Sequence, residues 1–576
     1  MNKDNISYAK KIIKLNSTKD INNLNEEPIS NNNNISIIQN NTNNSTYNIP
    51  SPLLIKKNFK IDNIINNSSV FSSFNIKIYI IIMLVIMADG GESSVVSFLI
   101  PILEDQWNFN TLQKGFFGTC GAIGALLGGS IAGNWSDIKG RKPMFILGNL
   151  LASVFACLAS FSNNIYQYAV CRITFGFGVG ISITAASALT TEITSSKSRA
   201  WMLNVIWLFF PLGELYCSVI ANFLLVNDNE IVLNSFNKIQ NSSSLNFNNS
   251  SQYDSSIFSF DSTNFNNTIN QNITNDVYIF NGINIKNLDK WRKLMLLVAL
   301  PCILSTIVSF FVSESPRYLL NKEKYTQAFK IIDYINIANN KPILSEEDKH
   351  ILIKEQIDIN SRNYKSINAF DNYKQLFKDK YLYTTLLISG IYFVMATSWG
   401  GLSIIMPKVI GQKEKEKSIK YNTPEDKHKA YTTFIISAFL EIPCTLLASF
   451  LAEIKILGRK GALMLSFALC FIPCTLIVIH VHGFSVFLII TRFLTTIPFG
   501  IAYIYNNEVF PTNIRSTALG VLGGMSRISA ISSPFIMFAL LDIGFIYPFL
   551  FCSILFLMGI VLSFLLPLET IGKDIS

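Results

Sequence analysis

Apolar residues are gathered in this chain into long windows, and polar segments separate one window from the next. A hydrocarbon core about 30 Å thick requires roughly 20 apolar residues in a helix that crosses it, so windows of this length predict membrane-spanning helices. With 49% hydrophobic and only 15% charged residues, the composition agrees. Twelve windows meet the requirement, near residues 76–103, 114–135, 143–162, 165–190, 201–226, 292–313, 382–409, 430–453, 461–481, 484–506, 517–541 and 545–567.

Two short charged motifs occur once in each half of the chain. The copies of the first run from Glu192 to Arg199 and from Glu508 to Arg515. Each copy closes an apolar segment that opened with an arginine, Arg172 or Arg492. The second, a glycine followed by arginine and lysine, begins at Gly140 and returns at Gly458 with nearly the same offset. The chain is therefore predicted to be an all-α membrane protein in which twelve helices form two pseudo-symmetric six-helix bundles.

The polar segments complete the expected organisation. The first bundle includes an asparagine- and serine-rich loop over 227–290, which this topology places outside. Low apolar content predicts that the N-terminal segment is disordered. The expected order is a cytoplasmic asparagine-rich tail over 1–75, an N-terminal bundle over 76–313, a cytoplasmic linker over 314–380, a C-terminal bundle over 381–567 and a cytoplasmic tail over 568–576.

Lysine and arginine in the short loops predict the orientation, because they are enriched on the cytoplasmic side. Segment 411–429 disagrees, with six lysines, although acidic residues partly offset them. Both termini are expected inside, in a plasma membrane, with a vesicle or other internal membrane as the alternative. The chain is expected to be a monomer. The net charge of +9 is spread over many loops, so no nucleic-acid partner is expected. The inside loops contain Lys139, Arg141, Lys142, Lys197, Arg199, Lys455, Arg459, Lys460 and Arg515.

Several of these motifs resemble the major facilitator superfamily. The segment from Gly133 to Lys142 is similar to the superfamily's loop signature between spans two and three, and that from Arg172 to Gly180 to its fourth-span pattern. The segment from Glu314 to Leu319 resembles the one that follows span six in sugar and organic-ion porters. The resemblance implies the twelve-helix major facilitator fold and transport by alternating access.

A second set of motifs resembles the synaptic-vesicle-protein-like and organic-ion-type branch of that superfamily. They run from Ala88 to Glu92, from Glu441 to Pro443, from Tyr503 to Arg515, from Arg527 to Pro534 and from Leu566 to Thr570. The asparagine and lysine bias suggests an A/T-rich genome, and among parasite carriers the chain resembles the pantothenate transporters. This resemblance implies a carboxylate as the transported solute.

Opposite charges at the cytoplasmic helix ends predict an inner gate, formed by pairs within one half or between the halves. Each pair contributes on the order of 1 kcal/mol or less at a wet surface, but several together bias a two-state equilibrium. Lys455 stands where Asp137 stands in the first half, so the gate is expected to be asymmetric. The alternative is that these charges only anchor the loops to the membrane surface. The expected gate residues are Asp137, Arg141, Glu192, Arg199, Glu508 and Arg515.

Ionisable residues inside the spans predict a second site, because they are costly in a membrane and usually face a cavity or a partner. Asp89 and Glu92 are three residues apart and therefore lie on one side of a helix. Two acids so placed can share a proton. We expect Asp89, Glu92 and Arg172 to form a proton-coupling site. The alternative is that the acids pair with Arg172 for structure alone.

Arg527 is the expected anchor of the substrate, because it lies deep in its span. The resemblance to organic-ion carriers implies that the matching arginine lies near the central cavity and favours anions. A guanidinium holds a carboxylate through two parallel hydrogen bonds. The alternative is that Glu441 or Asp89 neutralises Arg527. The other expected substrate-binding residues are Glu441, Glu214, Tyr392, Trp399 and Tyr503.

The sequence shows no catalytic constellation, no metal-ligand spacing and no phosphate-binding loop, so neither a cofactor nor an enzymatic activity is expected. The expected partners are a small solute, protons and the lipid bilayer. The leading hypothesis is a gradient-driven carrier of a carboxylate such as pantothenate. A sugar or an organic cation is the alternative solute. A non-transporting membrane receptor or vesicle scaffold on the same fold is the alternative from another class.

Overall fold

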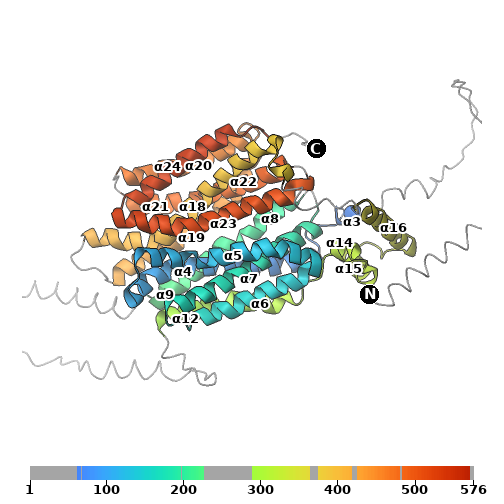
Figure 1. The fold of residues 1–576 in the computed structure, drawn as a ribbon, viewed down its shortest axis with the longest axis horizontal. Coiled ribbons are helices and arrows are strands. Elements are labelled where there is room, and N and C mark those ends of the chain that lie inside the picture. Colours follow the sequence, from blue (N-terminus) through green and yellow to red (C-terminus); the bar gives the residue numbers. More distant parts are fainter. Residues whose placement is uncertain are drawn as a thin grey trace, which may run out of the picture. The chain divides into compact units, whose positions relative to one another are not determined.

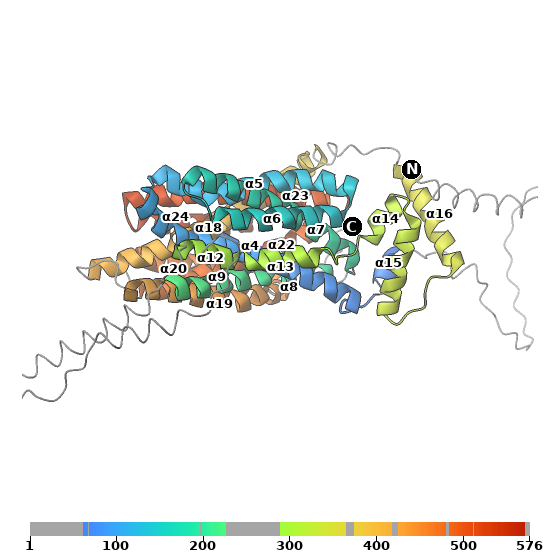
Figure 2. The ribbon, with the colours of Figure 1, turned by 90° about the horizontal axis from the view of Figure 1, so that it is seen from below.

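The computed structural model describes residues 61–66, 68–195, 198–225, 289–363, 374–417, 424–479, 483–510 and 512–570. The chain divides into two units, which are treated separately below. The membrane unit comprises Ser69–Ser315 with Asn363–Ser576, and the small unit comprises Met1–Ser68 with Pro316–Arg362. Figures 1 and 2 together label their helices, and the described residues contain no strand.

Twelve segments of the membrane unit are long and apolar enough to cross a membrane, which confirms the predicted all-α, twelve-span architecture. Nine of them are single helices and three are helix pairs. In chain order the helices are α4 (Ser73–Trp107), α5 (Thr111–Lys139), α6 (Arg141–Ala159), α7 (Ile165–Ile193), α8 (Arg199–Trp207) with α9 (Phe209–Leu225), α12 (Lys290–Val298) with α13 (Leu300–Ser309), α18 (Asp379–Lys417), α19 (Pro424–Glu453), α20 (Gly458–Val478), α21 (Phe484–Leu494) with α22 (Thr496–Val509), α23 (Thr512–Ile543) and α24 (Tyr547–Leu565).

A proline follows each of the three helix breaks. Proline has no N–H to donate to the carbonyl four residues earlier, so the helix loses a hydrogen bond there. Pro211 and Pro498 lie just after the breaks of spans five and ten. The break of span six comes before Pro301. There the hydroxyl of Tyr216 donates to the carbonyl of Leu297, at 2.8 Å, and so satisfies the oxygen that Pro301 cannot reach.

Glycines let α4 and α9 cross at backbone contact. A Cβ built on Gly213 would lie 1.9 Å from the carbonyl oxygen of Met87, and one on Gly90 would lie 2.1 Å from that of Phe210. Only glycine fits such a crossing, and small residues serve this purpose widely between membrane helices. The crossing brings Glu214, the next residue on α9, beside the first span.

The two halves of the membrane unit meet along several helices. Helix α5 of the first half packs against α23 of the second, and α9 packs against α19. Within the first half, α5, α6 and α7 lie side by side in both views (Figures 1 and 2). Any charged side chain on the facing surfaces of α4, α9, α19 or α23 is therefore close to the other half.

The small unit combines part of the predicted tail with part of the predicted linker, which the sequence treated as two separate segments. Its helices are α3 (Ile61–Asn66), α14 (Pro316–Asn321), α15 (Tyr325–Ala338) and α16 (Glu346–Asn363). Ile64 is buried together with Leu320, Ile332 and Leu352. Apolar residues of α3 at helical spacing thus bury one face of a helix inside the stretch 1–75 predicted to be disordered. The chain before residue 61 and the loop over 226–288 lie outside the described residues.

Candidate functional site

Glu92 and Arg172 form a buried ion pair within the first half. Helix α7 positions the guanidinium so that Nη1 lies 2.6 Å from Glu92 Oε2, and Nη2 donates to the backbone oxygen of Glu92, also at 2.6 Å. Both side chains are almost inaccessible, and the guanidinium carbon lies 4.7 Å from the ring centre of Phe175. Two of the three predicted proton-coupling residues are therefore bound to each other in a fixed geometry.

Asp89, the third of these residues, has different surroundings. It lies on α4 one turn before Glu92 and is buried, yet no hydrogen bond or ion pair holds its carboxylate among the described residues. It interacts electrostatically with Arg527 and with Arg172. Because Arg527 belongs to α23, this interaction acts between the two halves.

Arg527 lies on the face of α23 that packs against the first half. Farther along this face, Pro534 and Phe535 press against glycines of α5. A Cβ built on Gly523 or Gly524 would meet no atom within 4 Å, so there is open space one turn from Arg527. Its half-buried guanidinium forms no hydrogen bond or ion pair with another described residue.

Glu214, Glu441 and Arg492 meet in a second buried group, which is called the Arg492 cluster below. Nη1 of Arg492 binds Glu441 of α19, and Nη2 lies 3.1 Å from Oε2 of Glu214 on α9. All three side chains are at most 2% exposed. The alternative in which Glu441 neutralises Arg527 is therefore wrong, because Glu441 is bound to a different arginine.

Sequence analysis missed Arg492 as a site residue, although the internal repeat offers a signal for it. Arg492 lies in the window that precedes Glu508, just as Arg172 lies in the window that precedes Glu192. Both arginines are buried, and both bind buried carboxylates. The match between the two repeats was sufficient to predict a second buried arginine, but it was insufficient to predict its partners.

The predicted aromatic residues divide into two groups. Trp399 of α18 stacks on Arg492, with 4.8 Å between the guanidinium carbon and the ring centre. Phe210, from the other half, lies 5.6 Å from Trp399 between ring centres. Tyr392, by contrast, accepts a hydrogen bond from Asn506 of α22 at 2.7 Å, and Tyr503 lies on the same helix as Asn506. Trp399 therefore belongs to the Arg492 cluster, whereas the two tyrosines lie between α18 and α22.

The helix ends around the loops 137–142 and 455–460 are called the motif end. There the described gate charges pair within each half. Arg141 binds both Asp137 and Glu192, each at 2.9 Å. In the second half Arg459, which was not predicted, binds Glu508 at 2.8 Å. The side chains of Arg199 and Arg515 lie outside those that the structure describes.

Two further glutamates, also missed, fix the loops of the motif end. Glu314 accepts hydrogen bonds from the backbone N–H groups of Arg141 and Lys142, at the start of α6. Glu569 accepts in the same way from Arg459 and Lys460, at the start of α20. A carboxylate suits this position because the first amides of a helix lack partners and carry partial positive charge. Each half thus has its own network of the same kind.

Polar bridges between the halves occur at the opposite end, called the far end below. Glu104 at the end of α4 binds Lys408 of α18 at 2.7 Å, and also Lys114 of α5 at 2.7 Å. The hydroxyl of Thr111 donates to Asp542 of α23. At the motif end, no ion pair joins the halves among the described side chains. There the amide of Asn204 on α8 donates a hydrogen bond to the hydroxyl of Ser449 on α19, in the other half.

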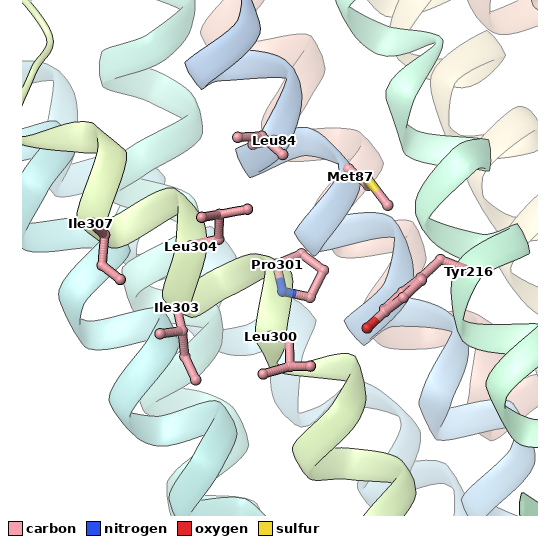
Figure 3. Close-up of a pocket in the computed structure, with 8 residues that line it drawn as sticks. All are labelled: Leu84, Met87, Tyr216, Leu300, Pro301, Ile303, Leu304 and Ile307. Carbon is pink, nitrogen blue, oxygen red and sulfur yellow. The ribbon is translucent and has the colours of Figure 1, made fainter.

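A pocket of about 410 Å³ lies apart from all these charges. It forms between α4, α9 and α13, beside the break before Pro301, and Figure 3 shows Tyr216 at one side of it. Its walls are apolar, and its long side chains at Leu304 and Ile307 are exposed on the outside of the unit. It contains none of the predicted site residues.

Comparison with known proteins agrees with this architecture. Residues 81–228 match the profile of the Major Facilitator Superfamily, and residues 276–576 match the profile described as Sugar (and other) transporter. The chain is 24% identical over 522 residues to the Synaptic vesicle 2-related protein of Xenopus laevis, which covers 88% of this chain and 80% of that protein.

Solved structures of the xylose transporter XylE from E. coli share the fold. A partially occluded inward-open form has a TM-score of 0.58 and 15% identity, over 87% of this chain and 100% of that one. A second structure, titled as the proton:xylose symporter bound to 6-bromo-6-deoxy-D-glucose, has a TM-score of 0.55 and 16% identity, over 86% and 96%. At such low identity these similarities show the fold alone.

Proposed function

Because this chain belongs to the sugar (and other) transporter family of the major facilitator superfamily, we propose that it carries a small organic anion, bound through its carboxylate to Arg527. The carrier class follows from the family and from the twelve spans. The solute class is inferred from Arg527. Pantothenate is the carboxylate that we take as the first solute to test.

The observation that carries this proposal is the guanidinium of Arg527, to which no described residue forms a hydrogen bond or an ion pair. A buried or half-buried arginine in a membrane span normally has a bound carboxylate, as Arg172 and Arg492 do. Arg527 has none among the described residues, and open space lies beside it at Gly523 and Gly524. A carboxylate from outside the protein supplies the two missing hydrogen bonds, each stronger than a bond between neutral groups.

Asp89 supports coupling of this anion to protons. Its negative charge attracts Arg527 across the halves and so competes with an incoming carboxylate. A proton on Asp89 removes that competition and adds one positive charge for each anion bound. In this proposal Glu92 and Arg172 hold α4 in place, and Asp89 carries the proton.

The remaining predicted residues have supporting roles in the proposed carrier. Tyr392 and Tyr503 complete the substrate site between α18 and α22, and Trp399 joins it to the Arg492 cluster, with Glu214 and Glu441. The motif end forms the inner gate through Asp137, Arg141, Glu192 and Glu508, with Arg199 and Arg515. Lysine and arginine in these loops support a cytoplasmic position for the motif end and for both termini.

Purified protein in liposomes tests the substrate proposal. We expect uptake of labelled pantothenate, and no uptake of labelled pantothenol, in which a hydroxymethyl group replaces the carboxylate. Arg527→Ala is expected to reduce kcat/KM for pantothenate by roughly 10-fold to 100-fold, since a hydrogen bond to a charged group contributes about 1.5–3 kcal/mol. Equal uptake of both solutes, or an unchanged kcat/KM in Arg527→Ala, would contradict the carboxylate clamp.

A sugar is the second candidate solute. The family description and the fold relative titled as a proton:xylose symporter favour it, although both concern other proteins. Labelled xylose in the same liposomes distinguishes the two solutes. Uptake of neither solute would favour the receptor or scaffold alternative.

A further inference from the structure

The Arg492 cluster contains two carboxylates and one guanidinium. If all three groups are ionised, the cluster carries one excess negative charge. Its side chains are at most 2% exposed, so water does not screen this charge. A net charge enclosed in a membrane protein is costly unless a cation accompanies it.

The other charges inside the described spans do not supply that cation. Arg172 is matched by Glu92 at 2.6 Å. Arg527 is opposed by Asp89. The lysine charges of α5 and α18, Lys114 and Lys408, lie at the far end, where both bind Glu104. The excess charge therefore belongs to the Arg492 cluster itself.

The described helices that pack against Glu214 bring no further cation to the Arg492 cluster. A proton is therefore the simplest counter-charge. Helix α4 presents Asp89 and Glu92, which are both acidic, and Ser94, which contacts Glu214. Helix α19 presents Glu441, and Arg492 comes from α21. Helices α8 and α12 carry basic residues only in their first turns: Arg199, Lys290, Arg292 and Lys293.

We propose that Glu214 and Glu441 hold one exchangeable proton between them, and that this proton unlatches the two halves of the membrane unit. Two carboxylates that share one partner at close range cannot both remain ionised at low cost, and they titrate as a pair. The proton comes from water and forms an O–H bond on a carboxylate oxygen. No other covalent bond changes.

The geometry indicates which bond the proton weakens. Glu441 and Arg492 belong to the same half and are in close contact. Glu214 belongs to the other half, and its oxygens lie 3.1 and 3.3 Å from Nη2. A proton on Glu214 removes the charge that holds it to Arg492, while the pair within the second half stays intact. The latch between the halves therefore opens as the pH falls.

This inference rests on the proposed carrier only for its use in transport. The latch itself is a property of the protein without substrate, so it is measurable even if the solute proposal fails. Conversely, transport of pantothenate that depends on Arg527 would stand even if no latch existed. The two proposals therefore fail separately.

Distances between spin labels in the full-length protein test the latch. Labels on Phe223→Cys of α9 and Phe450→Cys of α19 report across the halves, since both side chains are exposed on the surface. Double electron–electron resonance is recorded between pH 4 and pH 9 in liposomes without substrate. Protein that lacks both substitutions shows how much label reaches the native cysteines.

We expect two distance populations whose ratio changes with pH in the otherwise unaltered protein. Glu214→Gln imitates the protonated residue and should show the separated population at every pH, with at least about 10-fold less pH dependence of the ratio. Glu441→Gln removes the excess charge and should hold the latch closed at every pH. Glu346→Gln, at an exposed carboxylate of α16 in the small unit, is the control and should keep the pH dependence.

Two results would overturn the latch. The first is a population ratio that does not change with pH in the unaltered protein. The second is a pH dependence that survives in both Glu214→Gln and Glu441→Gln. Because glutamine keeps the size and the polarity of glutamate, both variants are expected to fold. If one of them fails to fold, the other still decides the question.

Discussion

Arg172 and Arg492 occupy matching positions in the two repeats but bind differently. Arg172 takes one carboxylate, Glu92, from its own half. Arg492 takes two, and Glu214 comes from the other half. The first arrangement matches one guanidinium with one carboxylate and holds one bundle together, whereas the second matches one guanidinium with two carboxylates and joins the bundles. The same position in the repeat therefore makes a contact within one half and a contact between the halves.

The helix ends show the opposite trend. At the motif end, Arg141 with Glu314 and Arg459 with Glu569 form nearly the same network in both halves. Both halves need their loops fixed, so the repeat is kept there. The two halves therefore differ at the centre of the spans and at the far end, and they are alike at the motif end.

Removing the two arginines should give the largest effect and the clearest test of this contrast. Loss of one partner of a buried ion pair costs about 3–5 kcal/mol. Arg172→Ala strands one carboxylate, whereas Arg492→Ala strands two that repel each other. We therefore expect the thermal unfolding temperature in detergent to fall more for Arg492→Ala. Arg527→Ala is the control and should lower it less than either, because Arg527 is only half-buried and binds no carboxylate directly among the described residues.

Adding Glu214→Gln and Glu441→Gln to Arg492→Ala sharpens this prediction. The two glutamines remove the stranded charges and should restore most of the unfolding temperature. A larger fall for Arg172→Ala than for Arg492→Ala would contradict the comparison, and so would the absence of any recovery in the triple variant.

Asp89→Asn should give the next largest effect. Asparagine cannot exchange a proton, so accumulation of pantothenate driven by a pH gradient should fall to roughly the equilibrium level. Exchange of labelled for unlabelled pantothenate should continue within about 3-fold, because Arg527 and its space are unchanged. The ratio of accumulation to exchange in liposomes is the measurement. Accumulation at the unaltered level in Asp89→Asn would exclude this residue as the coupling site.

Glu104→Gln should give the smallest effect. It weakens the far-end bridge to Lys408, and a partly exposed ion pair contributes about 1 kcal/mol or less. The ratio of the two conformations should therefore shift by about 5-fold or less. The matched control is Glu346→Gln, whose pair with Lys349 lies within one helix of the small unit and should leave that ratio unchanged. Spin-label distances measure both, and an equal shift in both variants would count against the distinction.

The sequence was sufficient to predict the twelve spans and the repeat, because a span needs a long apolar window and each motif has a fixed spacing. It was insufficient to predict which charges meet. Glu441 was associated with Arg527 because both lie deep in the second half, but the structure binds Glu441 to Arg492. Partners depend on how each helix is rotated about its axis, and spans that are apolar nearly all round carry little signal for that rotation.

Bridges between the halves were the least predictable feature. Glu104 and Lys408 lie far apart in the chain, and each looks like an ordinary residue at the end of a span. Lys408 lies close to the lysine-rich segment 411–429 that disagreed with the charge rule, and its pairing with Glu104 shows that lysine at this end has a structural partner. Loop charge counts cannot separate that role from a topological one.

Locking the far end tests most directly whether the two halves alternate. Glu104→Cys and Lys408→Cys, introduced together, place two thiols where the ion pair joins the halves. We expect that a short bifunctional thiol crosslinker abolishes pantothenate uptake into liposomes. A reducible version of the linker should restore uptake on reduction, and each single variant should stay active. Full uptake by quantitatively crosslinked protein would contradict it.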